Sequence, residues 1–211
     1  MALPFSHIGG DPALDLVNTV DWTAAGPARD RLADYAALVG WAEGAGLVPP
    51  ADAARLRRAA LRHPREARRA HARALALRAL LRDAFGPAGP RQAAAVRRLN
   101  PLVAEALPHL RLAGAGPGTR RQEWRWAGLD ERFDAPLWPV LRAAALLLAS
   151  EEADLVRTCA GPDCGWMYVD RSRNGLRRWC QMRTCGTREK SHRRRVGAEG
   201  RSVRIRRAPA Q

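Results

Sequence analysis

This 211-residue sequence lacks long apolar segments, has almost no lysine, and carries none of the familiar catalytic motifs. Its longest uninterrupted apolar run, Ala143 to Ala149, is far shorter than the roughly 20 residues that a membrane-spanning helix needs. The first residues do not combine a charged start with an apolar stretch, so we expect no secretory signal peptide. Glycine-rich phosphate-binding motifs, the His-Glu-x-x-His motif and internal repeats are also missing. The sequence therefore predicts a cytoplasmic protein that is not an enzyme and has no membrane partner.

The basic residues are almost all arginine, and they are concentrated near the C-terminus. The formal net charge is +15, and Lys190 is the one lysine among 36 basic residues. Residues 1–156 hold 21 basic and 17 acidic residues, whereas residues 157–211 hold 15 and 4. Because arginine is also frequent in chains from GC-rich genomes, the position of the charge tells more than its chemistry. A positive C-terminal segment predicts a polyanionic partner.

The N-terminal part of the chain is predicted to be mainly helical. The first helix begins at Pro12, after Asp11 as N-cap. Apolar periodicity and Pro or Gly boundaries predict further helices at about 30–44, 51–62, 64–85, 91–106 and 136–157. Pro101 is expected to kink or split its helix.

A change of periodicity between residues 109 and 127 interrupts the helices. Residues 109–113 and 122–126 alternate polar and apolar side chains around a turn-like segment, which predicts a small β-hairpin. The expected fold class is therefore mainly α with a small β-hairpin (α+β). Five tryptophans are expected to pack in its core rather than form a ligand cage: Trp22, Trp41, Trp124, Trp126 and Trp138.

All four cysteines lie close together in the sequence, as Cys159-x4-Cys164-x15-Cys180-x4-Cys185. Two short-spaced pairs joined by a longer segment can present four thiolates to one tetrahedral zinc ion. Buried or redox-active thiols are the alternative. We predict one Zn²⁺ per chain, held by these four residues. Because four thiolates close the coordination shell, the zinc is expected to be structural rather than catalytic.

The segment between the cysteine pairs predicts a second hairpin. Residues 166–170 and 176–180 flank a turn that contains Asn174-Gly175, and a helix is expected over 186–195. Knuckle, hairpin and helix in this order resemble a treble-clef or ribbon-type zinc module. A core of roughly 30 residues is too small to fold alone, so zinc should supply the folding free energy.

Arginine is dense around the predicted zinc site. A zinc ion with four thiolates has a formal charge of −2, so a few of these cations would only neutralise it. The remainder suit phosphate, and Arg and Asn are also the usual readers of guanine and adenine. The predicted nucleic-acid-binding residues are Arg171, Arg173, Asn174, Arg177, Arg178, Arg188, Lys190, Arg193, Arg194 and Arg195.

The segment from Cys159 to Lys190 resembles the CGNR zinc finger, and Leu14 to Thr19 looks like the opening motif of the ABATE domain that usually precedes it. The resemblance implies that the four cysteines are zinc ligands and that the protein is a stress-induced transcription regulator whose finger binds DNA. Thr187 stands where the Asn of the finger's name is expected, so a bidentate amide contact is lost there. Residues that match the finger's signature are Ser172, Arg173, Asn174, Arg177, Arg178, Trp179, Arg188 and Lys190.

Three polar residues of the N-terminal motif, Asp15, Asn18 and Thr19, lie close together on the first helix. They would either line a small-molecule pocket or brace neighbouring segments, and we favour the structural role.

The resulting prediction has three parts. Residues 1–155 form an ABATE-like domain that senses a small-molecule effector or forms a homodimer. Residues 156–195 form the zinc finger, which contacts DNA, and residues 196–211 form a basic, disordered tail that adds phosphate affinity. Such a protein would be associated with the nucleoid in the cytoplasm. RNA or ribosome association through the same basic surface is one alternative, and a thiol redox sensor that uses the zinc cysteines is another.

Overall fold

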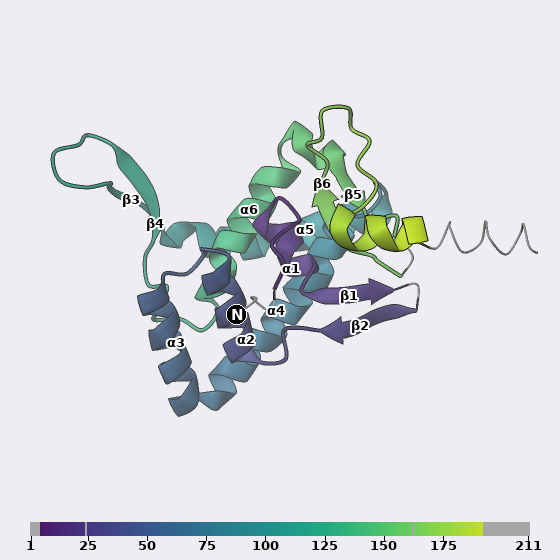
Figure 1. Ribbon diagram of the computed structural model, residues 1–211. Helices are drawn as coiled ribbons and strands as arrows, with labels where there is room; N and C mark the ends of the chain where they lie inside the picture. Colours follow the sequence, from purple (N-terminus) through teal and green to yellow (C-terminus); the bar gives the residue numbers. More distant parts are fainter. Residues whose placement is uncertain (1–4, 24, 162, 192–211) are drawn as a thin grey trace, which may run out of the picture.

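The computed structural model describes residues 5–23, 25–161 and 163–191 of the chain (Figure 1). The predicted basic tail and the cations Arg193, Arg194 and Arg195 lie outside the described residues. Among the described residues, no helix is long and apolar enough to cross a membrane.

Helices make up most of the body. They are α1 (Pro12–Val17), α2 (Tyr35–Gly44), α3 (Pro50–Arg62), α4 (Pro64–Ala84), α5 (Pro90–Ala106) and α6 (Trp138–Leu148). The Asp11 carboxylate accepts the Ala13 N–H at 2.8 Å and so caps α1, and Asp34 caps α2 through the Ala37 N–H at 2.8 Å. The helices expected at 51–62 and 64–85 are confirmed almost to the residue, because proline marks each start.

The longest helix, α4, organises the core. It contacts α1, α2, α3 and α5, and its buried face carries Ala70, Ala74, Leu77 and Leu81. The short helix α1 lies in the middle of the body, between α4 and α6 (Figure 1). Its residues from Ala13 to Val17 are all buried, which is why a six-residue helix is stable here.

Three antiparallel hairpins complete the fold. They pair β1 (Val20–Thr23) with β2 (Gly26–Asp30), β3 (Leu110–Gly114) with β4 (Gln122–Trp126), and β5 (Val156–Thr158) with β6 (Met167–Val169). The β3–β4 hairpin confirms the one predicted between residues 109 and 127, and it projects away from the helical body (Figure 1).

Two predicted helix boundaries are wrong. The helix expected from residue 30 begins at Tyr35, because residues 26–30 pair with β1 instead. The helix expected over 136–157 is α6, which ends at Leu148, where the Ser150 hydroxyl donates to the Leu147 carbonyl at 2.9 Å. A 3₁₀ segment (Glu151–Leu155) and β5 follow.

Other expectations for the body are partly met. The helix α5 continues through Pro101, so Pro101 does not split it, and of the two expected outcomes a kink stays a prediction. Trp41 and Trp138 are fully buried, as expected for core residues. Trp124 is 56% exposed, which contradicts its placement in the core, because it lies on the projecting hairpin.

The predicted hairpin between residues 166 and 180 is also wrong. β6 is present, but it pairs with β5 in the register Val156↔Val169 and Thr158↔Met167. The segment 176–180 forms no strand. β6 cannot pair with it because β5 lies along one of its edges and residues from the N-terminus bond to the other. Of the C-terminal helix expected over 186–195, residues 187–191 are helical and follow a π-helical turn (Met182–Gly186), and residues 192–195 lie outside the described residues.

Candidate metal centre and the surrounding basic surface

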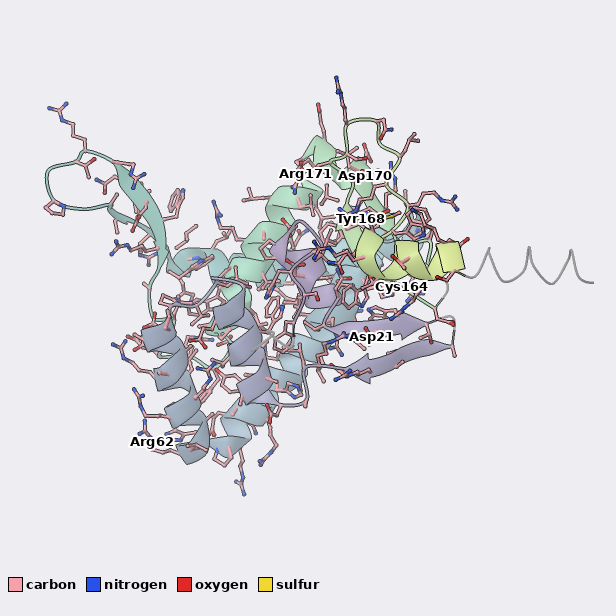
Figure 2. The ribbon with its side chains drawn as sticks, viewed as in Figure 1. Asp21, Arg62, Cys164, Tyr168, Asp170 and Arg171 are labelled. Carbon is pink, nitrogen blue, oxygen red and sulfur yellow. The ribbon has the colours of Figure 1, made fainter. Side chains whose placement is uncertain are left out.

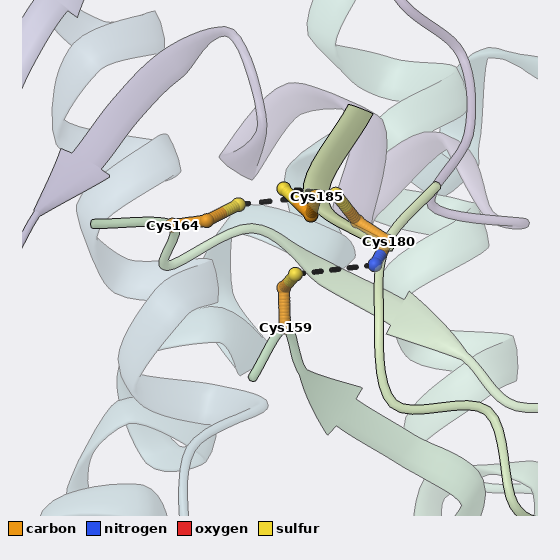
Figure 3. Close-up of side chains that lie close together, drawn as sticks. All are labelled: Cys159, Cys164, Cys180 and Cys185. Carbon is orange, nitrogen blue, oxygen red and sulfur yellow. Dashed lines mark hydrogen bonds between the residues drawn. The ribbon is translucent and has the colours of Figure 1, made fainter. Parts of the chain in front are cut away.

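The four cysteine side chains converge on one point (Figure 3). Their sulfur atoms all lie within 4.8 Å of one another, with Cys164 Sγ 3.8 Å and Cys185 Sγ 3.7 Å from Cys180 Sγ. A tetrahedral zinc ion with Zn–S bonds of about 2.3 Å requires sulfurs about 3.8 Å apart. The donor set and its spacing therefore fit one Zn²⁺ per chain.

Local backbone contacts bring the two cysteine pairs together. Cys159 follows β5 and Cys164 precedes β6, and the Cys159 N–H donates to the Trp166 carbonyl at 2.8 Å. The Cys180 N–H donates to Cys159 Sγ at 3.2 Å, which joins the second pair to the first (Figure 3). Gly161 permits this approach, since a Cβ there would lie 3.0 Å from Cys185 Cβ.

The charge state of the cluster favours a cation. Hydrogen bonds from Cys164 and Cys180 lower the pKa of Cys159, and the contact with Cys159 raises the pKa of Cys164. The same contact raises the pKa of Cys180. One thiolate is thus stabilised at the expense of its neighbours, and a divalent cation would allow all four to ionise together.

The loop that joins β6 to Cys180 is held by a buried carboxylate. Asp170 accepts the Ser172 N–H at 3.0 Å, the Ser172 hydroxyl at 2.5 Å and the Arg177 N–H at 3.1 Å. The hydrogen bond from Ser172 lowers the pKa of Asp170. On the other side of the loop, the Tyr168 hydroxyl donates to the Arg177 carbonyl at 2.6 Å. The loop that carries Arg173 and Asn174 is therefore an ordered element.

Two of the predicted nucleic-acid-binding residues bond to the protein itself. Arg171 donates to both carboxylate oxygens of Glu152, at 2.5 and 2.7 Å, and to the Gly10 carbonyl at 2.8 Å. Figure 2 shows Arg171 beside Asp170 and Tyr168. The Arg177 guanidinium lies 4.1 Å from the Tyr168 ring and donates to the carbonyls of Trp179 and Cys180.

The remaining predicted contacts within the described residues point to solvent. Arg173, Asn174, Arg178, Arg188 and Lys190 are all exposed. They come from the 170–177 loop, from the segment before Cys180 and from the helix after Cys185, so all five lie on the segments that flank the second cysteine pair.

The three polar residues of the N-terminal motif all have protein partners. The Asn18 amide donates to the Met167 carbonyl at 2.7 Å and accepts the Met167 N–H at 2.8 Å. Asp15 accepts the Gly9 N–H at 2.8 Å. The Thr19 hydroxyl donates to the Leu16 carbonyl at 2.7 Å and accepts from Arg78, 3.2 Å away.

The finger also docks on the body through residues that the sequence did not single out. The Gly165 N–H donates to the Trp22 carbonyl at 2.8 Å, and Arg82 donates to the Gly165 carbonyl at 2.8 Å. The Trp166 indole N–H donates to the Val20 carbonyl at 3.1 Å. No periodicity or spacing marks these contacts. The position of Gly165 and Trp166 directly after a zinc ligand is the only signal that could have suggested them.

Fold and site together define a helical protein with a docked C-terminal zinc finger. Comparison with family models agrees. The chain belongs to the ABATE family, whose model matches residues 10–151 and is described as "Putative stress-induced transcription regulator". Residues 156–196 match the CGNR zinc finger. Curated proteins provide no match to this chain.

Proposed function

We propose that this chain is a DNA-binding transcription regulator whose zinc finger contacts DNA. The observation that carries the proposal is the set of exposed residues on the segments that flank the second cysteine pair, namely Arg173, Asn174, Arg178, Arg188 and Lys190. Arginine and lysine bind phosphate, and Asn and Arg also bind base edges in the major groove. The family description supports the regulatory role.

Arg171 and Arg177 have a different role in this proposal. Both are bonded to protein groups, so they position the finger and its loop rather than touch DNA. Substituting them would lower stability, whereas substituting the exposed cations would weaken binding at unchanged stability.

The test is a salt titration of DNA affinity with the zinc-loaded full chain. Arg188→Ala/Lys190→Ala should flatten the slope of log affinity against log salt by about 1.8, because each phosphate contact contributes about 0.9. Arg62→Ala/Arg65→Ala removes the same charge from exposed positions and should leave the slope unchanged. Arg62 lies far from Cys164, at the other end of the molecule (Figure 2). Equal slopes for the two variants would refute a finger–DNA contact.

A competition experiment distinguishes DNA binding from RNA binding. Duplex DNA and structured RNA are added to one titration of the labelled complex. Preferential displacement by RNA would replace the DNA proposal with RNA or ribosome association.

We further propose that the N-terminal domain senses a ligand or forms a homodimer. A groove of about 230 Å³ between α4, α5 and α6 supports the ligand role. Leu77, Leu137 and Leu141 form its apolar floor, and Arg73 and Asp134 lie on its charged rim. Light scattering of the full chain decides whether it is a dimer.

The metal is proposed to be structural, and the protein to be non-catalytic and associated with the nucleoid. The closed set of four thiolates supports this role. Replacing zinc with Cd²⁺, which also binds four thiolates, should keep the DNA affinity within a few-fold.

A further inference from the structure

The β3–β4 hairpin is a ribbon with two chemically different faces. Its register places Leu110 opposite Trp126 and Leu112 opposite Trp124, and it places Arg111 opposite Arg125. Because directly opposed residues share a face and successive residues alternate, one face is apolar and the other is basic. The ribbon extends well beyond the helices (Figure 1).

The apolar face changes character along its length. At the base, Trp126 lies 6.2 Å from the buried ring of Trp138. Further out, Leu112 is 60% exposed and Trp124 is 56% exposed. The base of the ribbon is therefore anchored in the core, while its outer half presents an aromatic and an aliphatic side chain to solvent.

The charge of the ribbon is strongly positive. The ribbon contains four arginines, at positions 111, 120, 121 and 125, and one acidic residue, Glu123. Glu123 pairs with Arg125 at 2.5 Å. Arg120 and Arg121 lie at the exposed tip, and within the described residues their side chains have no ion-pair partner.

We propose that the β3–β4 ribbon is a second DNA contact, separate from the finger. Arg120 and Arg121 bind phosphates at the tip. A two-stranded ribbon fits the major groove of B-DNA. The exposed pair of Leu112 and Trp124 then contacts sugars and base edges, where apolar side chains are common. This inference rests on the proposed function, because it extends the same DNA ligand to a second surface.

A polyanion fits the ribbon better than a second copy of the chain does. Two paired ribbons would carry eight arginines against two glutamates, and the repulsion between their net positive charges opposes association. Glu123 already neutralises Arg125, so the uncompensated positive charge of the ribbon lies mainly at its tip, on Arg120 and Arg121. DNA phosphates would provide the anions for these two residues.

The first test compares charge-matched variants of the zinc-loaded full chain. Arg120→Ala/Arg121→Ala should flatten the salt dependence of duplex DNA binding by about 1.8 in log–log slope, whereas Arg62→Ala/Arg65→Ala should not. Both pairs are exposed and remove two charges. If the two variants have the same slope, the ribbon does not bind DNA.

The outcomes separate this inference from the proposed function. If the wild type binds DNA, Arg188→Ala/Lys190→Ala weakens it, and the tip variant matches the control, only the ribbon contact is refuted. If the wild type does not bind DNA at low salt, both proposals fail.

A second test locates the contact directly. The photo-crosslinking residue p-benzoylphenylalanine is incorporated in place of Trp124, and separately in place of Leu61, which is 85% exposed on α3. Position 124 should yield a protein–DNA adduct on irradiation with a labelled duplex, and position 61 should not. A protein–protein adduct from position 124 would overturn the proposal in favour of a second copy of the chain.

Discussion

Asn18 provides the most direct test of how the finger is held. Its amide forms two hydrogen bonds to the backbone of Met167, although 149 residues separate them in the chain. Asn18 is 2% exposed and Met167 is 3% exposed. Asn18→Ala removes the amide N–H and the amide oxygen that bond to Met167. The N–H and the carbonyl of Met167 then stay buried without these hydrogen-bond partners.

The expected cost follows from these two groups. A buried polar group left without a partner costs about 1–3 kcal/mol, so Asn18→Ala should lower the free energy of unfolding by about 2–6 kcal/mol. Entry of a water molecule would bring the loss toward the lower end. Since a domain is stable by about 5–15 kcal/mol, this is a large fraction of the total.

Urea unfolding of the zinc-loaded protein, followed by far-UV circular dichroism, measures the loss. With a slope of about 2 kcal/mol per molar urea, the midpoint should fall by about 1 M or more. Asn100→Ala is the matched control. Asn100 is exposed on α5, so its substitution should change stability by less than about 0.5 kcal/mol.

A second variant separates the loss of the hydrogen bonds from the loss of side-chain packing. Asn18→Asp preserves the shape and an acceptor for the Met167 N–H, but it places a carboxylate against the Met167 carbonyl. It should destabilise at least as much as Asn18→Ala. If both variants stay within about 0.5 kcal/mol of the wild type, the bridge does not hold the finger and the reasoning is wrong.

Three further changes test the site and the core. Cys180→Ser should abolish stoichiometric zinc, measured by mass spectrometry, and should lower the Tm of the whole chain, because Met167 and Val169 of the finger pack in the main core. Gly165→Ala should destabilise by about 1–3 kcal/mol in urea, since its Cβ would lie 2.6 Å from Trp22 Cβ. Gly40→Ala lies within α2 and its added Cβ would be 3.6 Å from the Arg57 guanidinium of α3, an ordinary contact, so it should not destabilise. Burial raises the pKa of Asp15 from 3.8 to about 6, so the folded state binds the proton more tightly. Wild-type stability should therefore fall relative to Asp15→Asn as the pH rises from about 4 to 6, by up to about 3 kcal/mol, and a pH-independent difference would contradict this.

Local signals in the sequence explain what could be predicted. Proline and glycine mark helix ends because they act on the backbone of their own turn, which is why α3 and α4 match their predicted bounds. The zinc cluster was predictable for the same reason, since each cysteine pair is separated by only four residues.

Long-range pairing explains which parts of the fold could not be predicted from the sequence. Three-residue strands such as β5 and β6 carry too little alternation to reveal their partner. On the edge of β6 that faces away from β5, the backbone N–H groups bond to Asn18 and Gly9, which are remote in sequence. Composition likewise cannot tell a cation that binds a ligand from one such as Arg171, which pairs with Glu152.

The docking of the finger has a consequence for DNA binding. β6 lies between β5 and the N-terminal segment, so the finger cannot rotate without breaking the bonds to Asn18 and Gly9. If the finger binds DNA as proposed, its exposed cations are presented in one fixed orientation relative to the body. The apparent affinity then scales with the fraction of molecules in which the finger is docked.

Asn18→Ala should consequently weaken DNA binding, although Asn18 is buried and cannot touch DNA. The loss should be seen in the dissociation constant but not in the salt slope, because the number of phosphate contacts is unchanged. Arg188→Ala/Lys190→Ala should change both quantities. A finger that acts independently of the body would instead bind DNA with the same dissociation constant in Asn18→Ala and in the wild type.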